Sequence, residues 1–224
     1  MPEFLLDIIM TLSILLGLAG IFVFKRFTKF EKYIGYYFIL VAVFEVIASI
    51  LIKVFDSDNN LLGLHVYTLL EFIILGLFFN HVFKELDTKL PIKLLLAIGS
   101  LLILANSLFV QPLTEFPSFS RTGVDSFILV FSMSFFILLI LKDYDSKLFR
   151  PSIFFVGALL VKSALSSIIY LFSNQIMNME VQLRDNLWMM RTVINLLAVG
   201  VMIYSVYLIY RRNQELKSQE IAIN

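Results

Sequence analysis

Residues 192–210 read TVINLLAVGVMIYSVYLIY and contain no charged side chain. At about 1.5 Å per residue, a helix over this run is long enough to cross roughly 30 Å of hydrocarbon. A strand of a membrane barrel would be about ten residues long and would alternate polar and apolar side chains, which this run does not do. The stretch therefore predicts a transmembrane α-helix.

Similar apolar runs recur along the rest of the chain, which is 59% hydrophobic and only 16% charged. Soluble domains carry about 25% charged residues, and the mean hydropathy of +0.89 is far above their range. We predict an all-α integral membrane protein: one seven-helix bundle over residues 1–210, followed by a short cytoplasmic tail over 211–224. The predicted spans lie near residues 4–24, 33–55, 61–83, 90–110, 124–142, 152–173 and 187–210.

The charges between these spans predict an orientation. Two basic residues, Arg121 and Arg184, fall in the loops of one side. By the positive-inside rule the opposite, basic side is cytoplasmic and the N-terminus lies outside, which is the parity that seven spans require. The basic side holds Lys25, Arg26, Lys29, Lys32, Lys84, Lys89, Lys93, Lys142, Lys147, Arg150, Arg211, Arg212 and Lys217.

Four charged residues away from the cytoplasmic ends of the predicted spans stand out: Glu45, Glu71, Lys162 and Arg191. A charge near the bilayer centre costs about 2.5–3.5 kcal/mol on insertion scales, so such residues usually face the bundle interior and have a partner. Counting the rise per residue places Glu45, Glu71 and Lys162 near the midplane and Arg191 nearer the outer surface. We predict that these two acids and two bases pair with one another, with Lys162 bonded to Glu45 or Glu71.

Polar neighbours at helical spacing extend this set from the midplane outward. Lys162 and Tyr170 lie on one stripe, and Arg191 is four residues before Asn195. We therefore predict one outward-facing cavity that holds a small polar or zwitterionic molecule, or a lipid headgroup. Its predicted lining is His65, Tyr67, Glu71, Asn106, Lys162, Tyr170, Arg191 and Asn195. The alternative is that the same groups form polar pairs that only fix the order of the helices.

Other polar or small residues are expected to have structural roles. Arg121 falls in a predicted outer loop, and Asp125 reads as an acid at the start of the fifth span, where the helix dipole favours negative charge. Ser13 and Gly17 have the small-xxx-small spacing of close helix packing.

The sequence does not favour an enzyme, a metal site or a cofactor. Its two histidines fall at opposite membrane faces and cannot complete a three-histidine zinc site. Nucleophile-elbow and Walker motifs are absent, and without cysteine there is no thiolate chemistry. The net charge of +1 gives no basic face for nucleic acid, so the lipid bilayer is the expected partner.

One stretch, His65-Val66-Tyr67-Thr68-Leu69-Leu70-Glu71-Phe72, resembles a group of small uncharacterised bacterial seven-span proteins. Similar membrane portions precede sensor histidine kinases. The resemblance extends to residues 106–109, 116–122, 187–188 and 195. It implies a sensor or receptor-like module in a bacterial inner membrane. Because no kinase follows within these 224 residues, a separate signalling protein would be its partner. A small-solute or ion transporter and a structural or assembly subunit remain open as alternatives.

Overall fold

The computed structural model describes residues 3–53, 60–142, 146–177 and 179–223, and this part of the chain contains helices and no strand. The all-α prediction is thus confirmed for the described residues. The helices are α1 (Glu3–Val23), α2 (Glu31–Lys53), α3 (Leu61–Glu85), α4 (Ile92–Ala105), α5 (Ser118–Leu141), α6 (Ser146–Leu171), α7 (Ser173–Met177) and α8 (Val181–Ile223), with a 3₁₀ turn η1 (Phe24–Arg26) and a π-helical turn η2 (Asn106–Val110).

Six helices in the described chain are long and apolar enough to cross a bilayer, judged by length and composition. They are α2, α3, α4 continued by η2, α5, α6 and α8. The predicted first span, 4–24, coincides with α1, which lies against α2. The last residues of the predicted second span, 54 and 55, lie outside the described residues.

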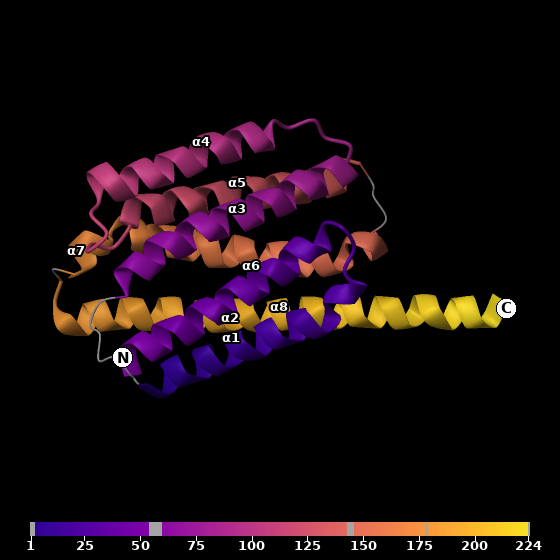
Figure 1. Ribbon diagram of the computed structural model, residues 1–224, viewed down its shortest axis with the longest axis horizontal. Helices are drawn as coiled ribbons and strands as arrows, with labels where there is room; N and C mark the ends of the chain where they lie inside the picture. The colour runs from indigo at the N-terminus through magenta and orange to yellow at the C-terminus, as the bar shows by residue number, and fades with distance from the viewer. Residues whose placement is uncertain (1–2, 54–59, 143–145, 178, 224) are drawn as a thin grey trace.

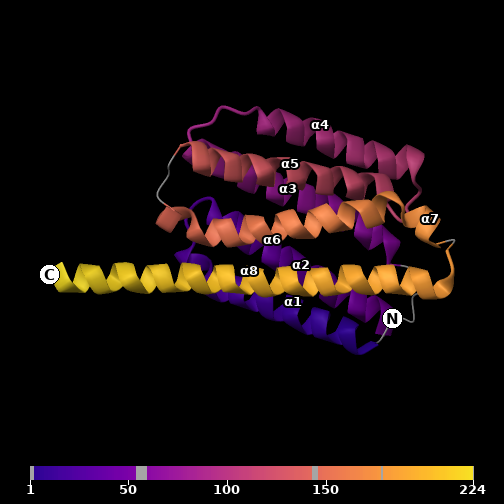
Figure 2. The ribbon, with the colours of Figure 1, turned by 180° about the vertical axis from the view of Figure 1, so that it is seen from behind.

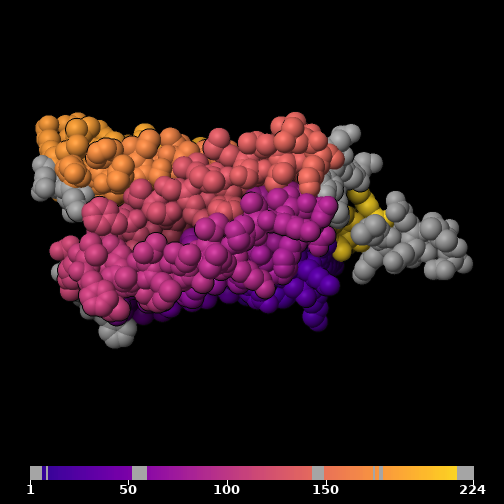
Figure 3. Space-filling model, turned by 90° about the horizontal axis from the view of Figure 1, so that it is seen from above, coloured from indigo at the N-terminus to yellow at the C-terminus, as the bar shows by residue number. Residues whose placement is uncertain are grey.

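Contacts between neighbouring helices close a ring of six. Helix α1 packs on α2, α2 on α3, α3 on α5, α5 on α6, α6 on α8, and α8 returns to α1. Helix α4 packs on α3 outside this ring, and it forms the outer layer of the bundle in Figures 1 and 2. The space-filling view shows α4 on one face of the molecule, beside α5 and α6 (Figure 3).

The two ends of the bundle differ. One end, called here the N-terminal end, holds the starts of α1, α3, α5 and α8 together with α7 (Figure 1). The other, called the tail end, holds η1 and the start of α6, and from it α8 continues well beyond the other helices (Figure 2).

Aromatic side chains fill the ring in the half nearer the tail end. Phe38, Phe78 and Phe155 are completely buried. The Phe155 ring meets the Phe78 ring edge-on at 5.3 Å and the Phe38 ring at 5.7 Å between centroids. These rings, called here the aromatic floor, leave the polar groups to the half nearer the N-terminal end.

Two helix boundaries differ from the prediction. Helix α5 begins at Ser118 rather than near 124, because Pro117 already accepts the first helical bond, from the Arg121 N–H at 2.9 Å. Helix α8 covers 181–223 and so extends past both ends of the predicted span 187–210, with residues 211–223 continuing the helix. The earlier start of α5 is important for the candidate site, because it brings Arg121 into the bundle.

Close packing of α1 on α2 depends on a glycine, Gly17, which has no side chain at the contact. A Cβ at Gly17 would lie 2.3 Å from the Cβ of Ala42, which no real pair of carbons tolerates. This contact confirms the close packing that the spacing of Ser13 and Gly17 predicts. At Gly200 in α8, by contrast, a Cβ would meet nothing within 4 Å.

We expect Gly17→Ala to lower the melting temperature of the protein in detergent, because the added methyl group overpacks the α1–α2 contact at a cost of about 1–3 kcal/mol. Adding Ala42→Gly should restore part of the loss. The matched control Gly200→Ala should raise the melting temperature slightly, through helix propensity alone. Equal responses to Gly17→Ala and Gly200→Ala would contradict the packing described here.

Candidate functional site

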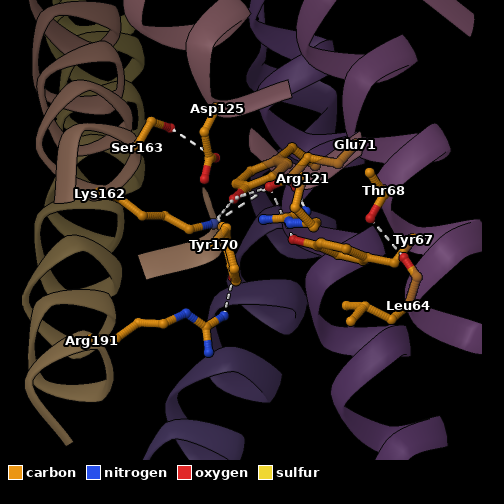
Figure 4. Close-up of polar contacts among 11 residues, drawn as sticks. Leu64, Tyr67, Thr68, Glu71, Arg121, Asp125, Lys162, Ser163, Tyr170 and Arg191 are labelled. Carbon is orange, nitrogen blue, oxygen red and sulfur yellow. Dashed lines mark hydrogen bonds and ion pairs between the residues drawn. The ribbon is translucent and has the colours of Figure 1, made fainter. Parts of the chain in front are cut away.

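The carboxylate of Glu71 lies in the middle of the ring with no exposed surface. Its Oε2 accepts a hydrogen bond from the guanidinium of Arg121 on α5, with which it forms an ion pair. Its Oε1 accepts from the hydroxyls of Tyr67 at 3.1 Å and Tyr37 at 3.3 Å, and it lies 3.4 Å from Lys162 Nζ. We call these five residues the Glu71 cluster, and Figure 4 shows four of them by label.

Arg121 is the largest fully buried side chain described, with 2% of its surface exposed. Its guanidinium carbon lies 5.5 Å from the ring centroid of Tyr67 and 5.0 Å from that of Tyr170, both within cation–π range. The placement of Arg121 in an outer loop was therefore wrong. A signal was present in the sequence: Arg121 and Asp125 are one helical turn apart, so a helix that begins earlier puts both on one face.

Asp125 is also buried, with 1% of its surface exposed. It accepts a hydrogen bond from the hydroxyl of Ser163 on α6 at 3.3 Å (Figure 4). It therefore joins α5 to α6 and lies two turns inside α5, rather than at the start of the helix as the sequence suggested.

Lys162 on α6 connects the cluster to open space. Its Nζ lies 3.0 Å from the Tyr37 hydroxyl and 3.4 Å from Glu71, and its side chain is 12% exposed. Of the two acids proposed as its partner, the structure selects Glu71. Glu45 on α2 has no hydrogen bond or ion pair to any residue in the described part of the chain.

A cavity of about 420 Å³ lies beside the cluster in the N-terminal half of the ring. All six ring helices contribute to it, from Leu16 and Met202 at its depth to Asp7 and Asn60 near the N-terminal end. Its lining is Asp7, Met10, Leu16, Tyr37, Val41, Phe44, Glu45, Ala48, Ser49, Asn60, Leu64, Tyr67, Arg121, Lys162, Tyr170, Arg191, Asn195, Val199 and Met202.

Arg191 on α8 reaches the same space from the opposite wall. One of its N–H groups donates a hydrogen bond to the Tyr170 hydroxyl (Figure 4). Its guanidinium carbon lies 4.7 Å from the Tyr170 ring centroid and 5.4 Å from that of Trp188. Because Arg121 lies over the same tyrosine, Tyr170 stands between the two arginines and links the buried cluster to the cavity wall.

Five of the eight residues predicted to line a cavity do so together: Tyr67, Lys162, Tyr170, Arg191 and Asn195. Glu71 lies behind the wall, with both oxygens occupied. His65 and Asn106 are not in this lining, so the prediction that all eight share one cavity differs from the structure.

His65 and Asn106 instead hold the turn between α4 and α5. His65 Nε2 donates to the backbone oxygen of Glu115 at 3.0 Å, while Nδ1 lies 2.7 Å from the Ser107 hydroxyl. Asn106 donates to Gln111 at 3.0 Å and to Ser120 at 2.9 Å. The reason is geometric. Position 65 is about 200° around the helix from 67, and α4 lies outside the ring.

Comparison of the chain with protein-family models, curated proteins and solved structures finds no significant match. Within the described residues, no three or more His, Asp or Glu side chains are grouped as a metal site would require. The arrangement presents an aromatic and aliphatic cavity with acidic and basic groups on its walls.

Breaking the Glu71 cluster from either side should be strongly destabilising. Glu71→Gln and Arg121→Gln each leave a buried charge without its partner, at a cost of about 3–5 kcal/mol in the free energy of unfolding. The double variant should cost less than the sum of the two, because it removes both charges. Thermal unfolding in detergent measures the effect.

The control for this cycle is the pair Arg211–Glu215, in which both side chains are 61% exposed. Glu215→Gln should change stability by less than about 1 kcal/mol. Strict additivity of the Glu71 and Arg121 changes would show that the two groups do not stabilise each other.

Proposed function

We propose that this protein is a seven-span receptor-like module of a bacterial inner membrane. It binds a small polar ligand in the ring cavity and signals through a separate protein. The observation that carries this proposal is a closed ring of helices around a cavity whose walls bear Glu45, Lys162 and Arg191. Ionisable side chains at membrane depth are costly and are found mainly where they serve a pathway or a ligand.

The seven-span topology adds α1 to the six helices that meet the length and composition criterion. Exposed basic residues at the tail end, such as Lys29, Lys84 and Lys142, support a cytoplasmic position for that end. The cavity would then face the outside of the cell.

The aromatic floor supports a receptor over a transporter. A transporter needs its central site to be reachable from each side in turn, whereas completely buried rings of Phe38, Phe78 and Phe155 occupy the ring toward the tail end. A site that ligands enter and leave from one side requires no such opening.

Helix α8 offers a route for the signal. It carries Arg191 and Asn195 in the cavity wall and then continues past the tail end of the bundle (Figure 1). At the tail end Arg212 makes two hydrogen bonds to the buried carboxylate of Glu31, at 2.7 and 2.9 Å. A ligand that prefers one position of Arg191 therefore acts on a single helix that extends to the cytoplasmic side.

The orientation can be tested with single cysteines, since the natural chain has none. Cysteines at the exposed positions Thr114 and Glu180 should react with a membrane-impermeant thiol reagent added to intact cells. Cysteines at the exposed positions Glu85 and Glu215 should react only after the membrane is opened. If only the second pair were labelled in intact cells, the protein would have the opposite orientation to the one proposed.

Ligand binding can be tested by native mass spectrometry of protein purified in a mild detergent. We expect the wild-type protein to retain a small adduct that Arg191→Ala loses, because the guanidinium is a cavity-wall donor suited to a carboxylate or phosphate. The neighbouring Met190→Leu, at a position 46% exposed, is the matched control and should keep the adduct. An adduct of equal occupancy in all three proteins would exclude this cavity as its site.

A further inference from the structure

The charges that face the cavity are not all available to a ligand. Glu71 accepts hydrogen bonds at both oxygens, and its two cationic partners are Arg121 and Lys162. Asp125, bonded to Ser163, adds a second negative charge beside Arg121. The two acids, Glu71 and Asp125, thus balance the two bases, Arg121 and Lys162. This buried group has no net formal charge that a ligand would need to neutralise.

Apart from Asp7, which has an interaction of its own near the N-terminal end, two charged residues on the cavity wall lie outside this balance. Glu45 lines the cavity from α2 and has no hydrogen bond or ion pair within the described chain. Arg191 lines it from α8, where one N–H donates to Tyr170 and the others have no acceptor among the described residues. A guanidinium has five such donors, so Arg191 has several left for a ligand.

Glu45 and Arg191 line the same cavity but form no ion pair with each other. The positive charges that act on the Glu45 carboxylate are those of Arg191 and Lys162, with Arg191 the stronger. No ion pair within 4.0 Å joins them, and α2 and α8 are separated in the ring by α1. The space between them belongs to a cavity of about 420 Å³, equal to roughly fourteen waters at about 30 Å³ each.

We propose that the ligand is a small zwitterion with an ammonium group and a carboxylate, of the size and type of an apolar amino acid. The ammonium binds Glu45, and the carboxylate binds Arg191. This assignment rests on the proposed function, because it names the ligand class of the same cavity.

Compensation of both wall charges favours a zwitterion over a ligand with one charge. A ligand with a single charge pairs with either Glu45 or Arg191 and leaves the other partly desolvated without a counter-charge, which costs free energy. A zwitterion pairs with both at once. Val41, Phe44, Val199 and Met202 in the same lining provide an apolar surface for the ligand's side chain.

The test is a set of thermal shifts in detergent with three matched groups of probes. The zwitterions are leucine, methionine and phenylalanine. The amines are the same molecules without the carboxylate, and the acids are the same molecules without the amino group. At ten times its Kd, a binding zwitterion should raise the melting temperature by about 3–6 °C, and each single-charge analogue by much less.

Two variants assign the ends of the ligand. Glu45→Gln should remove the advantage of the zwitterion over the matched acid, while Arg191→Ala should remove its advantage over the matched amine. Glu215→Gln, on an exposed surface, should leave all shifts unchanged. Should either variant fail to fold, Glu45→Asp and Arg191→Lys give the same comparison with the charge retained and its position changed.

Two results overturn the inference. Amines or acids that stabilise as well as the zwitterions show that the site takes a singly charged ligand, and the proposed function then stands with a different ligand class. No shift from any of the three groups also rejects the zwitterion. The adduct experiment with Arg191→Ala then decides separately whether the cavity binds anything.

Discussion

The burial of one carboxylate, that of Glu71, is the constraint on which the rest of this structure depends. A charge without exposed surface at membrane depth requires partners, and these come from three other helices: Arg121 from α5, Lys162 from α6, and Tyr37 from α2. With Glu71 itself on α3, one group fixes four of the six ring helices at the same level. Apolar contact alone contributes little free energy to helix association in lipid, so it does not specify one order of helices. Here the hydrogen bonds to Glu71 specify that order.

The same constraint separates structure from binding. Because Asp125 and the Glu71 cluster together balance their charges, Glu45 and Arg191 on the cavity wall are left to recognise something else. Tyr170 connects the two sets, since it lies over Arg121 and accepts a hydrogen bond from Arg191. A ligand at Arg191 is therefore one side chain away from the ion pair that holds the ring together, and it lies on the helix that leaves the bundle at the opposite end.

Much of this arrangement could be predicted from the sequence, because the bilayer imposes simple rules. Long uncharged runs such as 192–210 predict helices, and the cost of a buried charge predicts that Lys162 pairs with an acid. The choice between Glu45 and Glu71 could not be made, since it depends on which helices are neighbours. The role of Arg121 was missed because residues 118–125, SFSRTGVD, look too polar for a membrane span. The four-residue spacing between Arg121 and Asp125 nevertheless fits one face of a helix that begins earlier. His65 and Asn106 were assigned to the cavity by depth alone. Depth says nothing about direction, and α4 lies outside the ring.

The ring and its cavity depend on an ionised Glu71 in the membrane interior, held in that state by Arg121 and Lys162. Infrared difference spectroscopy of the wild-type protein against Glu71→Gln, in lipid bilayers at neutral pH, measures this directly, because a carboxylate and a carboxylic acid absorb in separate regions. We predict that the substitution removes a carboxylate stretching band and leaves the carboxylic acid region unchanged. Loss of a carboxylic acid band instead would show that Glu71 is neutral, and the charge balance from which the ring and its cavity are explained would be wrong.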